Sequence, residues 1–204
     1  MDAMPLIVFI RHGESTTNTE NVLTDALDGF PLTERGRGMA RGAMEEVRKL
    51  APSRIVSSPV LRAKDTAAII NEGLGLGLSL DDRLWERRMG AMNGRRGDRG
   101  MWRFESYSKP EFGSVEGWES VRARMRSFMD NAASLGGTTV AVSHGDPIAA
   151  AICEVLGLDE MAGFGVRVGH CRLSIIGFDG GYEVLGTDVP YVRPDLAVRM
   201  RRYQ

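Results

Sequence analysis

Two histidines in this sequence each follow an apolar run and precede a glycine. Arg11-His12-Gly13 comes directly after residues 6–10, and Ser143-His144-Gly145 comes directly after residues 139–142. Apolar runs of this kind, rich in β-branched residues, are typical of parallel strands buried on both faces. Chemistry in such sheets gathers at the carboxyl ends of the strands. The sequence therefore predicts one active site that contains both histidines.

Phosphoryl transfer suits this grouping, because it needs a nucleophile in line with phosphorus and cations around the phosphate oxygens. A neutral His12 could attack phosphorus, and neighbouring arginines should lower its pKa below the reference value of about 6.5. Arg11 offers a guanidinium fork that matches phosphate, and Gly13 lets the backbone approach a substrate closely. His144 is expected to give a hydrogen bond or a positive charge to the phosphoryl group, not to act as a second nucleophile.

Several polar residues near these strand ends allow two interpretations. Arg62 lies one turn into the helix expected after residues 55–59, and it is either a second phosphate clamp or a solvated helix residue. Ser15 and Asn18 either hydrogen-bond the phosphate and orient the nucleophile or stabilise the turn. For Asp146, near a helix N-terminus, capping is favoured over a catalytic role.

A leaving alkoxide also needs a proton, so a carboxylic acid with a pKa raised by burial should lie near the phosphate. Glu86 is one candidate, since it sits between apolar neighbours inside a long loop. Glu14 is the competitor, because it lies close to the nucleophile in the sequence.

The elements that must position these residues alternate between strand and helix patterns. The patterns predict an α/β fold in a single domain, 1–204, with a mostly parallel, doubly wound sheet flanked by helices. Gly180-Gly181 predicts a hairpin and hence one antiparallel edge strand. Residues 71–117 are rich in glycine and are expected to be irregular. The expected strands lie at about 5–10, 54–58, 138–143, 172–178 and 182–186, and the expected helices begin near Thr33, after Pro59, near 117 and at Pro147.

Composition limits the partners and the compartment. The chain has 204 residues, 43% of them hydrophobic, and a formal net charge of -1. It should have no general attraction to nucleic acid or to an anionic membrane. The two cysteines, Cys153 and Cys171, form no zinc-binding pattern and favour a reducing, cytoplasmic compartment. The N-terminus lacks the features of a signal peptide, and no apolar stretch reaches the length of a membrane span.

Several motifs in order resemble the histidine phosphatase superfamily, also called the phosphoglycerate mutase-like family. The resemblance implies a phosphohistidine intermediate on His12, a phosphate pocket of Arg11, Arg62 and His144, and Glu86 as proton donor and acceptor. No metal is expected. The motifs are Arg11-His12-Gly13-Glu14-Ser15 with Asn18, Pro31-Leu32-Thr33-Glu34-Arg35-Gly36, Ser57-Ser58-Pro59 with Arg62-Ala63 and Thr66-Ala67, Glu86, and Ser143-His144-Gly145.

The residues that follow Glu86 help to distinguish the mutases of this family from its phosphatases. Residues 86–94 resemble the mutase pattern Glu-Arg-x-x-Gly-Ala-x-x-Gly, which implies that Arg87 holds a substrate carboxylate. Three features depart from the mutases: the expected lysine is absent, the insertion with paired arginines is shortened, and Asp146 replaces an asparagine. An arginine cluster could supply the missing cations or form a solvated loop; its members are Arg87, Arg88, Arg95, Arg96, Arg99 and Arg103.

The first expectation is a 2,3-bisphosphoglycerate-dependent phosphoglycerate mutase that interconverts 3- and 2-phosphoglycerate and is primed by 2,3-bisphosphoglycerate. The alternatives are a broad-specificity histidine (acid-type) phosphatase of small phosphate monoesters and a non-catalytic phospholigand-binding regulatory protein. In each case the partner is a small phosphorylated molecule, and the family's frequent dimers and tetramers leave a homo-oligomer open. The residues expected to bind substrate are Ser15, Asn18, Arg87, Arg95, Arg96 and Gly145, and glycines 97, 100 and 113 could hinge a lid.

Overall fold

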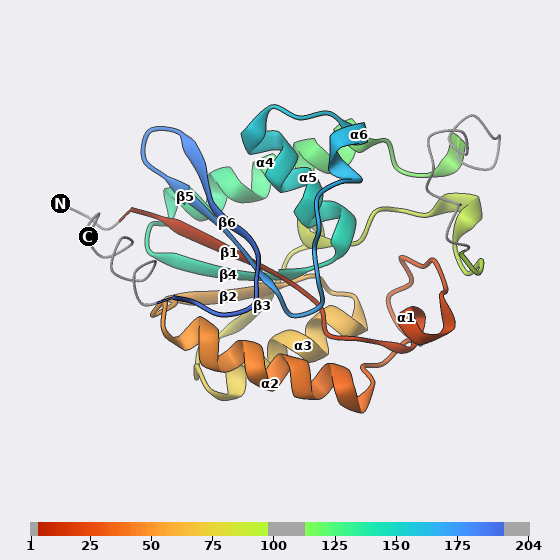
Figure 1. Ribbon diagram of the computed structural model, residues 1–204, viewed down its shortest axis with the longest axis horizontal. Helices are drawn as coiled ribbons and strands as arrows, with labels where there is room; N and C mark the ends of the chain where they lie inside the picture. The colour runs from red at the N-terminus through yellow and green to blue at the C-terminus, as the bar shows by residue number, and fades with distance from the viewer. Residues whose placement is uncertain (1–3, 98–112, 194–204) are drawn as a thin grey trace.

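A six-stranded sheet in the order β3-β2-β4-β1-β5-β6 forms the centre of the protein (Figure 1). The computed structural model describes residues 4–97 and 113–193. β1, β2, β3 and β4 run parallel to one another, β5 runs antiparallel to β1, and β6 runs antiparallel to β5. The strands are β1 (Leu6–Arg11), β2 (Arg54–Ser57), β3 (Leu78–Leu80), β4 (Thr138–Ser143), β5 (Leu173–Phe178) and β6 (Tyr182–Val189).

Helices cover both faces of the sheet, with α2 and α3 on one side and α4 and α5 on the other (Figure 1). The long helices are α2 (Glu34–Arg48), α3 (Leu61–Glu72), α4 (Trp118–Ser134) and α5 (Gly145–Leu156). Shorter elements are α1 (Thr16–Glu20), α6 (Glu160–Gly163) and the 3-10 turns η1 (Asp82–Leu84) and η2 (Gly90–Met92). None of the helices in the described residues is long and apolar enough to cross a membrane.

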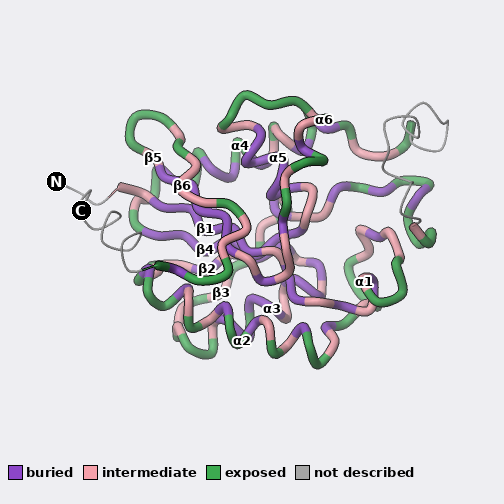
Figure 2. Tube along the Cα trace, in the orientation of Figure 1, coloured by how far each residue is buried: buried purple, intermediate pink, exposed green. Residues whose placement is uncertain are grey.

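The apolar runs become strands buried on both faces, as Figure 2 shows for β1 and β4. Successive side chains of a strand point to opposite faces. Val8 and Ile10 pack in the cluster with α2 and α3. Ile7 and Phe9 pack in the cluster with α4 and α5. β1 is therefore fixed between two helical layers, and its carboxyl end is held in place.

Strand register brings the two histidines together. β1 and β4 pair in parallel, with Arg11 opposite Ser143. The backbone N–H of His12 donates to the Ser143 carbonyl at 3.0 Å. His12 and His144 therefore leave neighbouring strands at the same level.

The predicted fold class is confirmed, with some differences of detail. The hairpin after residue 178 is present, but the reversed strand is β5, one position in from the edge strand β6. α5 begins at Gly145, two residues before Pro147. β3 was not predicted, because it has only three residues, lies at the edge and is largely exposed. The short helices α1 and α6 were not predicted either. Residues 98–112, which include Arg99, Gly100 and Arg103, lie outside the described part of the expected irregular stretch.

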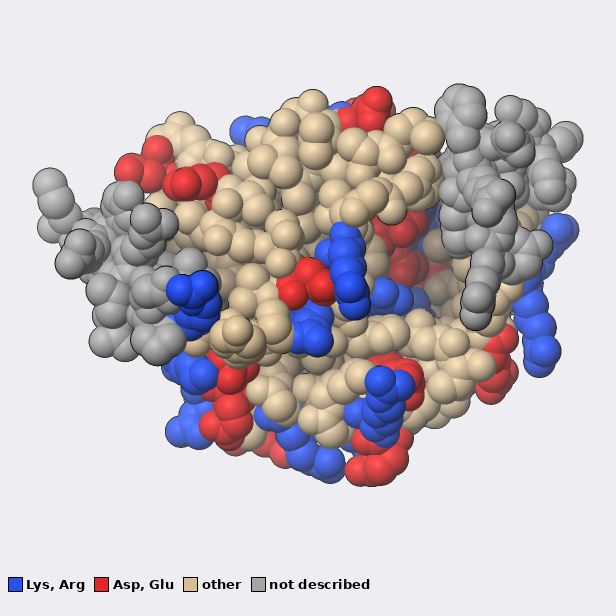
Figure 3. All heavy atoms as spheres, viewed as in Figure 1, with Lys and Arg blue, Asp and Glu red and all other residues tan. Residues whose placement is uncertain are grey.

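Charged side chains of both signs are interspersed on the face shown in Figure 3. This distribution accords with the formal net charge of -1. Cations that bind an anion must therefore be gathered locally.

Candidate active site

His12 lies directly after β1 and is 2% exposed. Its Nδ1 donates to the Gly13 carbonyl at 2.7 Å, and Arg62 Nε donates to its Nε2 at 3.2 Å. Since a guanidinium can only donate, Nε2 carries the lone pair and Nδ1 carries the proton. Burial, Arg62 and Arg11 lower the pKa of His12 well below its usual value. His12 is therefore a neutral imidazole whose Nε2 carries the lone pair of a nucleophile, and the bond from Arg62 Nε must be released before that lone pair attacks.

Two arginines flank this nucleophile. Arg62 is fixed by a second bond, from Nη2 to the Thr24 carbonyl at 3.0 Å, and Arg11 by a bond from Nη1 to the Val168 carbonyl at 2.8 Å. Gly145 lies next to Arg11, and a Cβ on this glycine would make an ordinary van der Waals contact with the guanidinium carbon at 3.7 Å. Both guanidinium groups are thus oriented before any substrate binds.

His144 is fully buried beside His12, with 5.2 Å between the ring centroids. Its Nε2 lies 2.9 Å from Ser58 Oγ, and the backbone N–H of Val60 donates to that oxygen. We assign the Ser58 hydroxyl as the donor to His144 Nε2, which places the ring proton on Nδ1, 3.7 Å from Glu86 Oε2. Burial, Arg62 and His12 lower the pKa of His144 well below its usual value, so it acts here as a neutral donor.

Unpaired donors surround the nucleophile. Arg11 Nε, Arg62 Nη1 and His144 Nδ1 are buried and have no hydrogen-bond partner among the described residues. A buried donor without a partner costs about 1–3 kcal/mol. The oxygens of a phosphoryl group on His12 Nε2 could accept from these donors, so the chemistry of the donor set fits a phosphate ester.

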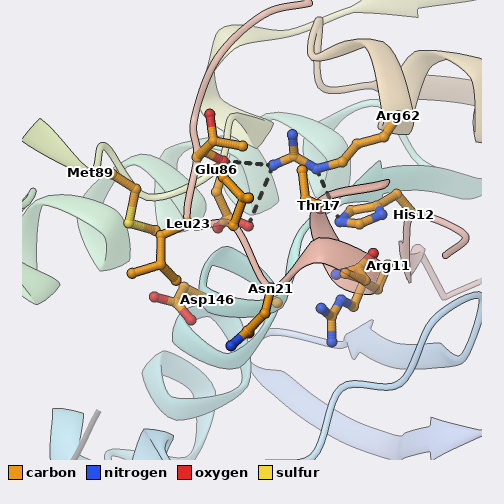
Figure 4. Close-up of a pocket in the computed structure, with 13 residues that line it drawn as sticks. Arg11, His12, Thr17, Asn21, Leu23, Arg62, Glu86, Met89 and Asp146 are labelled. Carbon is orange, nitrogen blue, oxygen red and sulfur yellow. Dashed lines mark hydrogen bonds and ion pairs between the residues drawn. The ribbon is translucent and has the colours of Figure 1, made fainter. Parts of the chain in front are cut away.

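A cavity of about 300 Å³ opens in front of His12 (Figure 4). Among the described residues, no group of three or more His, Cys, Asp or Glu side chains is arranged to hold a metal. Much of the remaining wall comes from residues 17–24 and from Met89; of these, Asn18 was predicted and the others were not. The lining residues are Arg11, His12, Thr17, Asn18, Asn21, Val22, Leu23, Thr24, Arg62, Glu86, Met89, Gly145 and Asp146.

Glu86 lies in this cavity between the cations and His144. Its Oε2 is 3.9 Å from Arg62 Nη2 and 3.7 Å from His144 Nδ1. Burial, followed by the nearby Asp146, raises the pKa of Glu86 to about 7, which suits an acid and base near neutral pH. The competitor Glu14 is held at 3.0 Å by Arg35 and does not line the cavity.

The expected substrate-binding residues divide into two groups. Asn18 and Gly145 line the cavity. Ser15 does not: it is the N-cap of α1, and its hydroxyl bonds Thr17 and Asn18, which is the turn-stabilising alternative. Arg95 and Arg96 are exposed and do not line the cavity, although their backbones are joined to Leu23 and Val22.

Arg87 also lies outside the cavity. Its Nε donates to the Glu116 carbonyl at 2.6 Å, and its Nη1 is 2.9 Å from Glu160 Oε1. Asp146 lines the cavity instead of Arg87, and 37% of its side chain is exposed. Its Oδ2 lies 3.9 Å from Arg87 Nη1. The expectation that Asp146 caps the helix is wrong, because the N-cap is His144 and Asp146 lies in the first turn.

His170 is a neighbour of His12 that was not predicted, although it does not line the cavity in front of His12. Its ring centroid is 5.6 Å from that of His12. Cys171, in the left-handed region with φ 52°, donates its backbone N–H to the Arg11 carbonyl at 2.9 Å. This hydrogen bond ties the backbone next to His170 to the end of β1. An available signal was the position of His170 just before β5, because an antiparallel strand starts where its neighbour β1 ends.

Comparisons with known proteins agree with this geometry. The model of the histidine phosphatase superfamily (branch 1) matches residues 7–187. A 2,3-bisphosphoglycerate-dependent phosphoglycerate mutase of Thermoplasma acidophilum is 32% identical over 182 residues, covering 87% of this chain and 90% of that protein.

Solved structures of low sequence identity share the fold. YhfR of Bacillus stearothermophilus has a TM-score of 0.80 at 23% identity, covering 92% of this chain and 98% of that chain. A mycobacterial glucosyl-3-phosphoglycerate phosphatase has a TM-score of 0.77 at 24% identity, covering 91% and 99%. The match of the family model along nearly the whole chain identifies the protein: it belongs to the histidine phosphatase superfamily, branch 1.

Proposed function

We propose that the protein is a phosphatase of small phosphate monoesters that works through a phosphohistidine on His12. The observation that carries the proposal is the neutral Nε2 of His12 surrounded by the unpaired donors of Arg11, Arg62 and His144. Nε2 attacks phosphorus, the bond from phosphorus to the ester oxygen breaks, and Glu86 gives its proton to the leaving alkoxide. The Glu86 carboxylate then takes a proton from the water that attacks the phosphohistidine, which releases inorganic phosphate.

Hydrolysis is favoured over mutase activity by the charges around the cavity. A phosphoglycerate carries a carboxylate besides its phosphate and needs a further cation. Among the described lining residues the cations are Arg11 and Arg62, which face the phosphate position. Arg87 is bound to Glu116 and Glu160 instead. The distal wall carries Asp146, which would repel a carboxylate.

The mutase is the second candidate, supported by the relative from Thermoplasma acidophilum and by the Glu86-Arg87 motif. The decisive experiment incubates the protein with 3-phosphoglycerate, with and without 2,3-bisphosphoglycerate, and follows 2-phosphoglycerate and inorganic phosphate. The phosphatase forms no 2-phosphoglycerate and releases phosphate without the primer, slowly from 3-phosphoglycerate, whose carboxylate meets Asp146, and faster from 4-nitrophenyl phosphate run in parallel. Primer-dependent 2-phosphoglycerate without net phosphate release would establish the mutase.

A non-catalytic phospholigand-binding protein remains the third candidate. Mixing the protein with 4-nitrophenyl phosphate and quenching it in alkali should trap acid-labile phosphate on His12 and none on the His12→Ala variant. Absence of labelling and turnover with all esters would support a binding protein.

A further inference from the structure

We propose that Asp146 determines the class of substrate: the site selects phosphomonoesters whose alcohol part carries an ammonium group and discriminates against those that carry a carboxylate. The inference rests on the proposed phosphatase function and assigns a specificity to the wall opposite the nucleophile.

The position of the leaving group follows from the geometry of the attack. The leaving oxygen must lie opposite His12 Nε2 and within reach of Glu86, because attack on phosphorus is in line. The alcohol part then extends past Glu86, away from the two arginines. In Figure 4 the side chains on that side are Met89, Leu23, Asn21 and Asp146.

Asp146 is the charged group on this distal side. It accepts no hydrogen bond from the described residues, and its nearest cation is Arg87 at 3.9 Å. Its place in the first turn of α5 favours a carboxylate through the helix dipole. The carboxylate oxygens of Asp146 therefore have no hydrogen-bond donor among the described residues, and a ligand in the cavity could donate to them.

Arg87 does not cancel this charge for a substrate. It is nearly fully buried, and Glu160 at 2.9 Å and the Glu116 carbonyl at 2.6 Å hold its guanidinium outside the cavity. A carboxylate on the substrate would have to draw Arg87 out of these contacts and approach Asp146 as well. An ammonium group meets Asp146 directly, while the methylene groups between it and the phosphate can pack on Leu23 and Met89.

The test is a series of esters of similar size that differ in terminal charge: 2-aminoethyl phosphate, propyl phosphate and phosphoglycolate. The wild-type protein should show the highest kcat/KM for the ammonium ester, about 10- to 100-fold above the carboxylate ester, the range expected for one partly exposed charge pair. Assays at about pH 8 favour an ionised Asp146, since burial raises the pKa of this group while Arg87 and Arg11 oppose that shift.

Asp146→Asn is the critical variant, because it removes the charge and keeps the shape. The ratio of the two kcat/KM values should fall at least tenfold. Since the ratio is taken within one variant, any effect of Asp146 on the protonation of Glu86 cancels. Asp146→Ser is the second variant if the first fails to fold. Asp130→Asn, on the surface of α4, is the control and should leave the ratio unchanged.

Two results would overturn the inference: a wild-type preference for phosphoglycolate, or a ratio in both Asp146 variants within threefold of the control. Failure of the proposed function looks different, since none of the three esters would then be hydrolysed: a mutase would still carry phosphate on His12, and a binding protein would carry none.

Discussion

Replacing Glu86 by glutamine tests the assignment of the acid. Glu86 Oε1 accepts the backbone N–H of Arg87 at 2.9 Å, and Oε2 faces Arg62 and His144. Glutamine fills the same space and keeps a hydrogen-bond acceptor, but it can neither give nor take a proton. The variant therefore separates proton transfer from packing.

The expected loss depends on the leaving group. General acid catalysis contributes about 10²- to 10⁴-fold, so kcat for an alkyl phosphate should fall by that factor in Glu86→Gln. An aryl phosphate such as 4-nitrophenyl phosphate leaves without needing a proton, so phosphorylation of His12 should be nearly unchanged. Hydrolysis of the phosphohistidine still needs a base. The variant should therefore release a rapid burst of nitrophenol and then accumulate phosphohistidine.

The assay is rapid-mix kinetics with both esters, together with quantification of phosphohistidine. Glu14→Gln is the matched control, because Glu14 is close in sequence to His12 but is bound to Arg35 outside the cavity. An equal loss in the rate of His12 phosphorylation with alkyl and aryl esters would refute proton donation by Glu86, and so would a larger loss of this rate in the control.

The same variant has a predicted effect on stability. The pKa of Glu86 rises from 4.5 to about 7 on folding, so the folded state binds more protons than the unfolded state between these values. The contribution of Glu86 to the free energy of unfolding is fully present below pH 4.5 and is lost as pH rises toward 7. Glu86→Gln should therefore be more stable than the wild type above that range, by at most about 3 kcal/mol. Chemical denaturation of both proteins at pH 5 and pH 8 measures the difference.

Three further substitutions test other contacts. Arg62→Lys should lower kcat about 10²- to 10³-fold, because lysine cannot bond His12 and Thr24 together while it binds phosphate; near-normal steady-state kinetics would contradict the clamp. His170→Ala should lower kcat about tenfold with little change in KM, because the His12 ring loses a neighbour that positions it, and His170→Phe should restore most of the rate. Gly36→Ala should destabilise the fold by about 3 kcal/mol or more, because its Cβ would overlap the Glu14 carbonyl. Gly38→Ala, with open space around its Cβ, should be neutral or stabilising in denaturant unfolding, and equal effects at both positions would refute the clash.

The sequence was sufficient to predict five of the six strands of the sheet and the residues that follow the carboxyl ends of β1 and β4. Residues 6–10 and 139–142 are almost entirely apolar, which predicts buried strands. Each run is followed two positions later by a histidine, and the parallel pairing of the two strands places the two histidines at the same level. β3 and α1 carry no such signal, because they are short and partly exposed. Their positions depend on contacts with distant elements.

The distal wall of the cavity could not be predicted for a similar reason. Arg87 follows the acid in sequence, yet Glu160 and Glu116 draw its side chain away from the cavity. Glu160 lies more than seventy positions further along the chain, and no local spacing pattern reports such a competition. The resemblance to the family predicted the residues gathered around His12 better than those that form the distal wall of the cavity.

The strand order also has a consequence for synthesis of the protein on the ribosome. β4 lies between β2 and β1 in the sheet. Until residues 138–143 leave the ribosome, β1 and β2 have no common neighbour, and both edges of β1 lack partners. Exposed edges of apolar strands invite pairing with other chains. While β4 is still missing, the nascent chain should therefore lack a continuous sheet. The sheet, and with it the pairing that brings the two histidines together, should form only after β4 has been synthesised.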